Sequence, residues 1–163
     1  FSNEKAERKA ISMPSASIKR RIPCSKENLI KMVLDIEKYQ EFVPWCLASK
    51  IHNTDYKGNI TEIIADLTIG KSFFKETYKS FIVYNKSLDS ITVTNINGPL
   101  KHLINKWFFK KIKNSSEIDF YIEFELKSKI LNLIMIKAFD VGLKKIGDAF
   151  EKRASDLFNK TQY

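Results

Sequence analysis

Few side chains in this sequence could carry out catalysis. The chain contains two histidines, His52 and His102, and two cysteines, Cys24 and Cys46. Neither a nucleophile with its general base nor a group of residues with metal-ligand spacing can be assembled from them. With five glycines, the sequence also has no phosphate-binding loop and no dinucleotide fingerprint. We therefore expect a protein that is not an enzyme and that uses neither a metal ion nor a catalytic cofactor.

The histidines and cysteines have simpler interpretations. His52 lies in an expected strand beside Lys50 and Asn53, and we expect it to face solvent. Cys46 is expected to be a small core residue, because nothing around it in the sequence would lower the pKa of its thiol. Two cysteines do not suggest a disulfide framework and fit a reducing compartment.

Two stretches have an unusual composition. The first, residues 39–46, ends a short helix and places Phe42, Pro44 and Trp45 at a loop. Large apolar groups at a loop can contact an apolar ligand. They can also simply stop the helix and pack on a sheet, so the sequence leaves both interpretations open.

The second stretch, residues 97–113, combines a turn, three consecutive aromatic residues and five lysines without one acid. Aromatic rings among cations are typical of surfaces that bind single-stranded nucleic acid or an anionic membrane. If Trp107 and Phe109 point to the core, however, the outward set is Lys106, Phe108 and Lys110. The next strand carries four acids in the outward register, and cross-strand ion pairs with them would neutralise this face. We therefore disfavour nucleic acid as a partner.

The composition limits which partners and which class of protein are plausible. The 163 residues carry 28 Lys and Arg against 19 Asp and Glu, a net charge of +9. That excess favours acidic partners such as nucleic acid, anionic lipid or an acidic protein face, although a solvated basic surface explains it equally well. A hydrophobic content of 44% supports one domain with a substantial core. No stretch is long enough for a transmembrane helix.

The element that must organise these residues is a helix expected over residues 129–160. Its segment 130–139 is apolar almost all round, whereas the remainder carries a stripe at helical spacing. The N-terminal half therefore needs cover on nearly every side, from protein or from lipid. Gly142 and Gly147 make the helix narrower, which allows either close packing on a sheet or room for a ligand.

The remaining pattern predicts an edge strand at residues 13–23, a helix capped by Ser25, and a second helix at 36–42 that stops before Pro44. Six more strands are expected at residues 47–53, 63–69, 73–84, 91–94, 103–113 and 118–126. Their short connections require antiparallel pairing. We predict an α+β fold, a curved antiparallel sheet of about seven strands around a long C-terminal helix. The domain spans residues 13–160 and follows a polar tail at residues 1–12.

Three segments resemble motifs of one family. YQEFVPWCLAS (residues 39–49), GPLKHLINKWFF (98–109) and YIEFELKSKILNLIM (121–135) resemble, in this order, coenzyme Q-binding START-like proteins. The resemblance implies a helix-grip fold whose hydrophobic tunnel binds ubiquinone or a related prenyl lipid. It also implies a peripheral protein on the matrix side of the mitochondrial inner membrane that supports respiration. Leu100 and Phe108 depart from the family pattern, which more often has phenylalanine and a cation at these positions.

The resemblance directs attention to a set of ligand-lining candidates. They are Phe42, Pro44, Trp45, Val93, Leu103, Trp107, Met135, Phe139 and Gly142. We expect the loop formed by Gly98, Pro99 and Leu100 to lie near residues 130–139 and to form, with the turn at residues 42–45, a mouth that meets the bilayer.

Charged residues and substitutions refine this expected site. Cations expected near anionic head groups are Lys101, Lys106 and Lys137. We expect Trp45→Asp or Leu100→Asp to abolish lipid transfer without unfolding the protein. Phe124→Asp should unfold it, because Phe124 is a core position of the clearest strand.

Two other classes of protein stay open. One is an accessory subunit of a mitochondrial respiratory membrane complex, with Phe108, Lys110 and the lysine-rich strand as its partner surface. The other is a ribosome- or RNA-associated protein, because bacterial relatives of the resembled family include a ribosome-association toxin. A cyclase on the same fold is least favoured, since no acid–base pair can be named.

Overall fold

The computed structural model describes residues 14–71 and 74–158, so the tail expected at residues 1–12 lies outside the described residues. In chain order the elements are β1 (Ser15–Ile22), α2 (Lys26–Leu34), the 3-10 helix η1 (Ile36–Lys38), α3 (Tyr39–Phe42), β2 (Cys46–Lys57), β3 (Ile60–Lys71), β4 (Phe74–Asn85), β5 (Ser90–Asn97), β6 (Leu100–Ile112), β7 (Ser115–Leu126) and α4 (Lys129–Phe158). The expected helix at residues 36–42 is therefore divided into η1 and α3.

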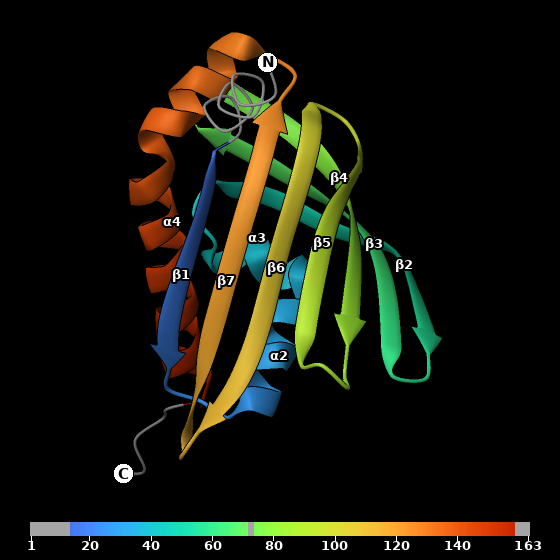
Figure 1. The fold of residues 1–163 in the computed structure, drawn as a ribbon, viewed down its shortest axis with the longest axis vertical. Helices are drawn as coiled ribbons and strands as arrows, with labels where there is room; N and C mark the ends of the chain where they lie inside the picture. The colour runs from blue at the N-terminus through green and yellow to red at the C-terminus, as the bar shows by residue number, and fades with distance from the viewer. Residues whose placement is uncertain (1–13, 72–73, 159–163) are drawn as a thin grey trace, which may run out of the picture.

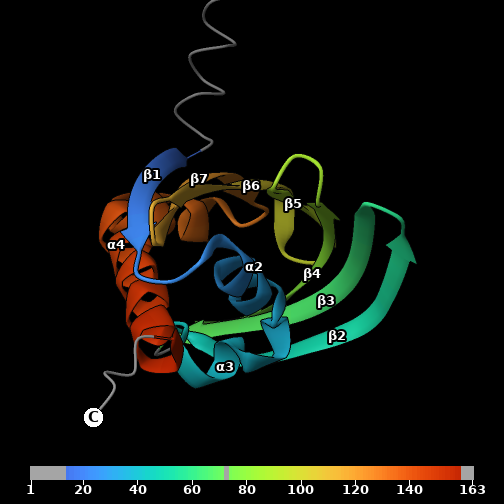
Figure 2. The same ribbon diagram turned by 90° about the horizontal axis from the view of Figure 1, so that it is seen from below.

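The seven strands form one sheet in the order β1-β7-β6-β5-β4-β3-β2, and every neighbouring pair is antiparallel. Figure 1 shows α4 beside the β1 edge of this sheet. Seen from below, the sheet curves around α2, α3 lies between the β2 edge and α4, and α4 closes the side next to β1 (Figure 2). The predicted fold class, a curved antiparallel sheet with a long C-terminal helix, is confirmed.

Local signals for the helix ends are also confirmed. The Ser25 hydroxyl accepts a hydrogen bond from the backbone N–H of Asn28 at 3.1 Å and caps α2. Val43 leaves the helical conformation with ψ of 126°. Pro44 explains this ending, because the proline ring disfavours helical geometry in the residue before it.

Several strands extend beyond their apolar centres. The strands expected at residues 47–53 and 91–94 run instead over Cys46–Lys57 and Ser90–Asn97. The added residues are mostly the polar ends of hairpins, where ladder hydrogen bonds form between backbones whatever the side chains are. Gly58, with φ of +63°, makes the tight turn between β2 and β3.

Buried apolar side chains form two clusters. The main cluster joins α2 and the concave face of the sheet to the C-terminal half of α4 (residues 143–158), from which Leu143, Phe150 and Ala154 are buried. The smaller, upper cluster consists of Leu100, Phe124 and Leu126, with several half-buried side chains packed against it. The two halves of α4 thus rest on different clusters.

No α-helix in residues 14–71 and 74–158 combines the length and apolar content that a membrane span requires.

Candidate functional site

The N-terminal half of α4 (residues 129–142) leaves much of its apolar surface uncovered. Ile130 is 74% exposed, Leu133 63% and Ile134 45%, and Met135 is also exposed. This end of the helix rises above the strand ends at the top of Figure 1. The segment that the sequence marks as apolar all round is therefore covered on one side only.

The covered side of this half rests on the upper cluster. Leu131 and Phe139 pack against it, and the Phe139 ring lies 5.1 Å from the ring of Phe124. The Pro99 carbonyl accepts a hydrogen bond from Lys127 N–H at 2.9 Å, just before α4 begins. The expectation that the loop at residues 97–100 lies near the start of the helix is therefore met.

Within that loop, Gly98 has φ of +112°, a conformation that side chains rarely allow. Leu100 differs from expectation. It is only 7% exposed, because the bulge between Leu100 and His102 turns it inward opposite Leu126. Leu100 is thus core in this structure, and the expectation that it forms an exposed lip is wrong. We now expect aspartate at this position to destabilise the fold.

The turn at residues 42–45 is also more buried than the rim of an open site would be. The Phe42 ring lies 5.1 Å from Phe150, and the Arg153 guanidinium lies 5.0 Å from the Phe42 ring centre. Pro44 is half-buried. Phe42 therefore belongs to the packing of the main cluster.

Trp45 reaches the middle of α4. A Cβ added to Gly142 would lie 3.4 Å from the Trp45 indole, so the glycine gives the ring its place on the helix. Trp45 has φ of +63°, and its carbonyl accepts a hydrogen bond from Gly70 N–H at 2.9 Å. Its half-buried ring lies near the boundary between the two halves of α4.

Other lining candidates occupy the concave face of the sheet. Trp107 is buried, donates a hydrogen bond to Asn105 Oδ1 at 2.7 Å and makes an edge contact with Phe120 at 4.7 Å. Val93 packs against the main cluster and Leu103 against the upper one. These side chains are part of the core in the described conformation.

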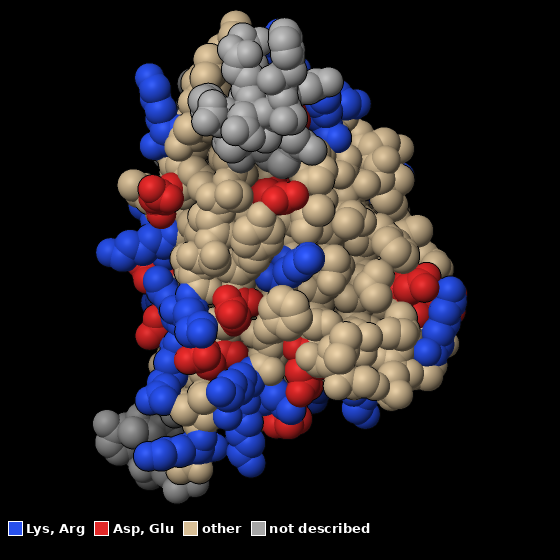
Figure 3. All heavy atoms as spheres, viewed as in Figure 1, with Lys and Arg blue, Asp and Glu red and all other residues tan. Residues whose placement is uncertain are grey.

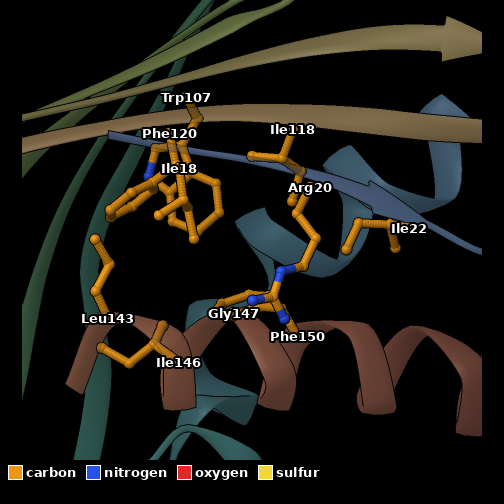
Figure 4. Close-up of a pocket in the computed structure, with 10 residues that line it drawn as sticks. All are labelled: Ile18, Arg20, Ile22, Trp107, Ile118, Phe120, Leu143, Ile146, Gly147 and Phe150. Carbon is orange, nitrogen blue, oxygen red and sulfur yellow. The ribbon is translucent and has the colours of Figure 1, made fainter. Parts of the chain in front are cut away.

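A small cavity lies between the C-terminal half of α4 and strands β1, β6 and β7. Its volume is about 20 Å³, and its walls include Trp107, Leu143 and Phe150 (Figure 4). That volume holds roughly one water molecule, whereas sites for drug-sized ligands occupy about 300–1,000 Å³. In the described conformation this cavity is too small for a lipid.

The described ion pairs that join α4 to other elements all lie in its C-terminal half. Arg20 of β1 pairs with Asp148 and, at 3.3 Å, with Glu151. Figure 4 shows Arg20 reaching from β1 to α4 beside Gly147. On the other side of the helix, Arg153 pairs with Glu41 of α3 at 2.8 Å. Among the described residues, no ion pair joins positions 129–147 of α4 to another element. The Arg20 contact could not be predicted from local sequence patterns, because it joins residues distant in the chain.

The outer face of β6 and β7 carries the charged residues that we expected to neutralise each other. Phe108 is 48% exposed as expected, but Lys106 and Lys110 make no ion pair within the described part of the chain. The cross-strand contacts that do form join Lys101 to Glu125 at 3.4 Å and His102 to Glu123. The expected neutralisation is therefore incomplete. Figure 3 shows this face, where Lys and Arg interleave with acids mainly toward the lower end.

The groups that could take part in catalysis are engaged or buried. Burial raises the pKa of both the Cys24 and the Cys46 thiols. His52 is exposed, as expected, and its ring nitrogen lies 2.7 Å from Asp66. Across the described ranges, no three His, Cys, Asp or Glu residues gather as a metal site would require.

A curved seven-stranded sheet, two small helices between its first two strands in the chain and one long helix closing its side define a START-like α+β protein. The chain belongs to the polyketide cyclase / dehydrase and lipid transport family, which matches residues 22–151.

Relatives of this chain carry different names. The ribosome association toxin RatA of Rickettsia prowazekii is 31% identical over 140 residues, which cover 83% of this chain and 92% of the toxin. The mitochondrial coenzyme Q-binding protein COQ10 of Dictyostelium discoideum is 32% identical over 135 residues, covering 80% of this chain and 63% of that protein. The solution structure of an 18 kDa protein from Caulobacter crescentus is 28% identical, with a TM-score of 0.74 and coverage of 88% and 97%.

Proposed function

We propose that this protein binds a prenylated quinone such as ubiquinone, without catalysis, beneath the N-terminal half of α4. The observation that carries the proposal is the apolar surface of that half, exposed at Ile130, Leu133 and Ile134 directly above the upper cluster. A family that includes lipid transport supports a lipid ligand, and a relative named as a coenzyme Q-binding protein supports a quinone.

Entry of the ligand requires the N-terminal half of α4 to lift. Separating Leu131 and Phe139 from the upper cluster costs about 2 kcal/mol each in lost burial. Contact of the exposed apolar residues with lipid contributes about 1–2 kcal/mol each and can offset that cost. The ion pairs of Arg20 and Arg153 hold the other half in place while this happens.

The same surface suits a membrane. Lys129 and Lys137 are exposed on this half, and Lys127 and Lys101 lie near its start. Each lysine near anionic head groups adds about 1 kcal/mol at low salt. We propose a peripheral position on the matrix side of the mitochondrial inner membrane, supported by the word mitochondrial in the names of the COQ10 relatives.

One experiment tests the ligand and a second tests the surface. Protein purified without detergent is extracted with organic solvent, and mass spectrometry of the extract should detect a prenylquinone. Ile134→Asp should weaken flotation with anionic liposomes, whereas Leu157→Asp should not. Both side chains are 45% exposed on the same helix, but Leu157 lies at the opposite end. An extract free of prenylquinone, or equal flotation by both variants, contradicts the proposal.

Ribosome association is a second candidate function. It is supported by the relatives named RatA and by Lys106, Lys110 and Lys113, which make no ion pair within the described residues. Such binding should weaken steeply as salt rises, because it releases counterions from RNA. Cosedimentation with ribosomes at low and high salt, compared between the natural chain and Lys110→Glu, tests it.

The exposed ring of Phe108 supports a third candidate, an accessory subunit of a respiratory membrane complex. Mild detergent extracts separated on native gels should then show the protein migrating with such a complex. Migration as a free monomer contradicts this candidate. Phe108→Ser should release the protein from the complex without changing its stability.

A further inference from the structure

Polar side chains gather on the concave face of the sheet on β4, β5 and β6, apart from the separate buried serines Ser49 on β2 and Ser116 on β7. Ser80 on β4 is 3% exposed and pairs in register with Asn95 of β5 and Ala65 of β3. Asn105 of β6 is buried opposite Val93 of β5. Tyr78, two residues before Ser80 on the same face, packs against the upper cluster. We call Tyr78, Ser80, Asn95 and Asn105 the polar band.

The two amides of the polar band have structural partners. Asn95 donates to the Leu100 carbonyl at 3.3 Å and accepts from Leu103 N–H at 3.0 Å, which fixes the connection between β5 and β6. Asn105 accepts from Trp107 and donates to the Tyr121 carbonyl at 2.9 Å. These bonds account for the presence of both asparagines in the core.

The two hydroxyls differ from the amides. Within residues 14–71 and 74–158, neither the Tyr78 hydroxyl nor the Ser80 hydroxyl makes a hydrogen bond to another residue. Among the described residues, the fully buried hydroxyls without a partner are those of Ser49 and Ser116. The Tyr78 and Ser80 hydroxyls therefore keep some access to solvent and can donate to a ligand. Burial also raises the pKa of Tyr78 to about 12, so its hydroxyl keeps its proton at neutral pH and acts as a donor.

We propose that the Tyr78 and Ser80 hydroxyls bind the carbonyl oxygens of the ligand head group. This inference rests on the proposed lipid-binding function and specifies its chemistry: a ring with carbonyl acceptors and an apolar tail. The Cα atoms of the two residues stand about 7 Å apart along β4, since they are two residues apart on one strand. Each donates a hydrogen bond to the head group, and no electron or proton transfer is involved.

The surroundings of the band give the ligand its direction. Leu103 and Phe139 adjoin it in the upper cluster, and Phe139 leads along α4 to the exposed Met135. The head group therefore lies deepest, against β4, and the tail runs under the N-terminal half of α4 toward the membrane. A long prenyl tail can leave the protein on this path.

The test compares two probes that differ only in their acceptors. Decylubiquinone carries the carbonyls, and decylbenzene has a ring and tail without them. Titration calorimetry should show that Tyr78→Phe and Ser80→Ala each weaken binding of decylubiquinone about fivefold, the effect of one neutral hydrogen bond, and leave decylbenzene unchanged. Tyr84→Phe is the matched control, because Tyr84 lies on the same strand but packs against the main cluster. Circular dichroism melting confirms that each variant is folded.

The possible results separate this inference from the proposed function. If Tyr78→Phe and Ser80→Ala both bind decylubiquinone as the natural chain does, the hydroxyls do not bind the head group, although the lipid function stands. Equal affinity of the natural chain for the two probes also overturns the inference. If the natural chain binds neither probe, the proposed function itself fails and the inference fails with it.

Discussion

The contact between Arg20 and Gly147 predicts a specific energetic coupling across the seam between β1 and α4. In a helix interior, alanine is about 1 kcal/mol more favourable than glycine. A Cβ at position 147, however, would lie 3.0 Å from Arg20 Cζ and 3.2 Å from Ile18 Cδ1. Arg20 must then shift and loses part of its ion pairs with Asp148 and Glu151, which are half-exposed and together contribute about 1 kcal/mol. Gly147→Ala alone should therefore leave stability nearly unchanged.

Removal of Arg20 changes this expectation. Arg20→Ala should lower the free energy of unfolding by about 1–2 kcal/mol, because the packing of its alkyl stem is lost with the ion pairs. In that background, Gly147→Ala should raise stability by about 1 kcal/mol. Urea unfolding of the four proteins, followed by tryptophan fluorescence, measures the cycle. If Gly147→Ala has the same effect with and without Arg20, the guanidinium does not occupy the space over the glycine and the reasoning is refuted.

Four further outcomes are expected from the same structure. Leu100→Asp and Phe124→Asp should each lower the free energy of unfolding by about 3 kcal/mol or more, because both side chains are buried in the upper cluster. Leu133→Asp is the control, since Leu133 is exposed and its replacement should not lower that free energy. Urea unfolding compares the three variants. Tyr39→Phe should cost about 1 kcal/mol in the same assay, since its hydroxyl donates to the Val33 carbonyl. Hydrogen bonds, chiefly from Lys38 and also from Arg153, lower the pKa of Glu41 below its usual 4.5. The contribution of these bonds to the stability of the fold is therefore complete above about pH 4.5 and is lost as pH falls further. Glu41→Gln should flatten the acid side of a stability–pH curve. Burial raises the pKa of the Cys24 and Cys46 thiols, so iodoacetamide at pH 8 should alkylate the folded protein far more slowly than the urea-unfolded chain.

Local patterns were sufficient to predict most of the fold. The alternation in β7 places Phe120 and Phe124 in the core and leaves Asp119 exposed, as period two requires. Ser25 and Pro44 marked helix ends through bonds and clashes that involve only neighbouring residues. Antiparallel order followed from short connections, because no crossover fits into them.

The site was harder to predict because it depends on register between distant strands. We expected Leu100 at the mouth of the site, but the bulge after it turns its side chain into the core. No local sequence pattern predicts such a bulge. The sequence also left open which face of β4 points inward, and so the hydroxyls of Tyr78 and Ser80 were not recognised. The sequence marked Phe42 and Trp107 as unusual aromatic positions. Both rings are covered by α4 through contacts with Phe150, which lies far away in the chain.

The pairing of β1 with β7 has a consequence for the order of assembly. Ile18 lies opposite Phe120, so this ladder closes a loop of roughly 100 residues, with an entropic cost of about 4 kcal/mol, whereas each hairpin closes only a few residues. The hairpins from β2 to β7 can therefore form first, and β1 joins last. Until it does, β7 is an open edge that can pair with another chain, and Arg20 is absent from α4. Sealing of that edge and fastening of the long helix are thus a single late step in folding.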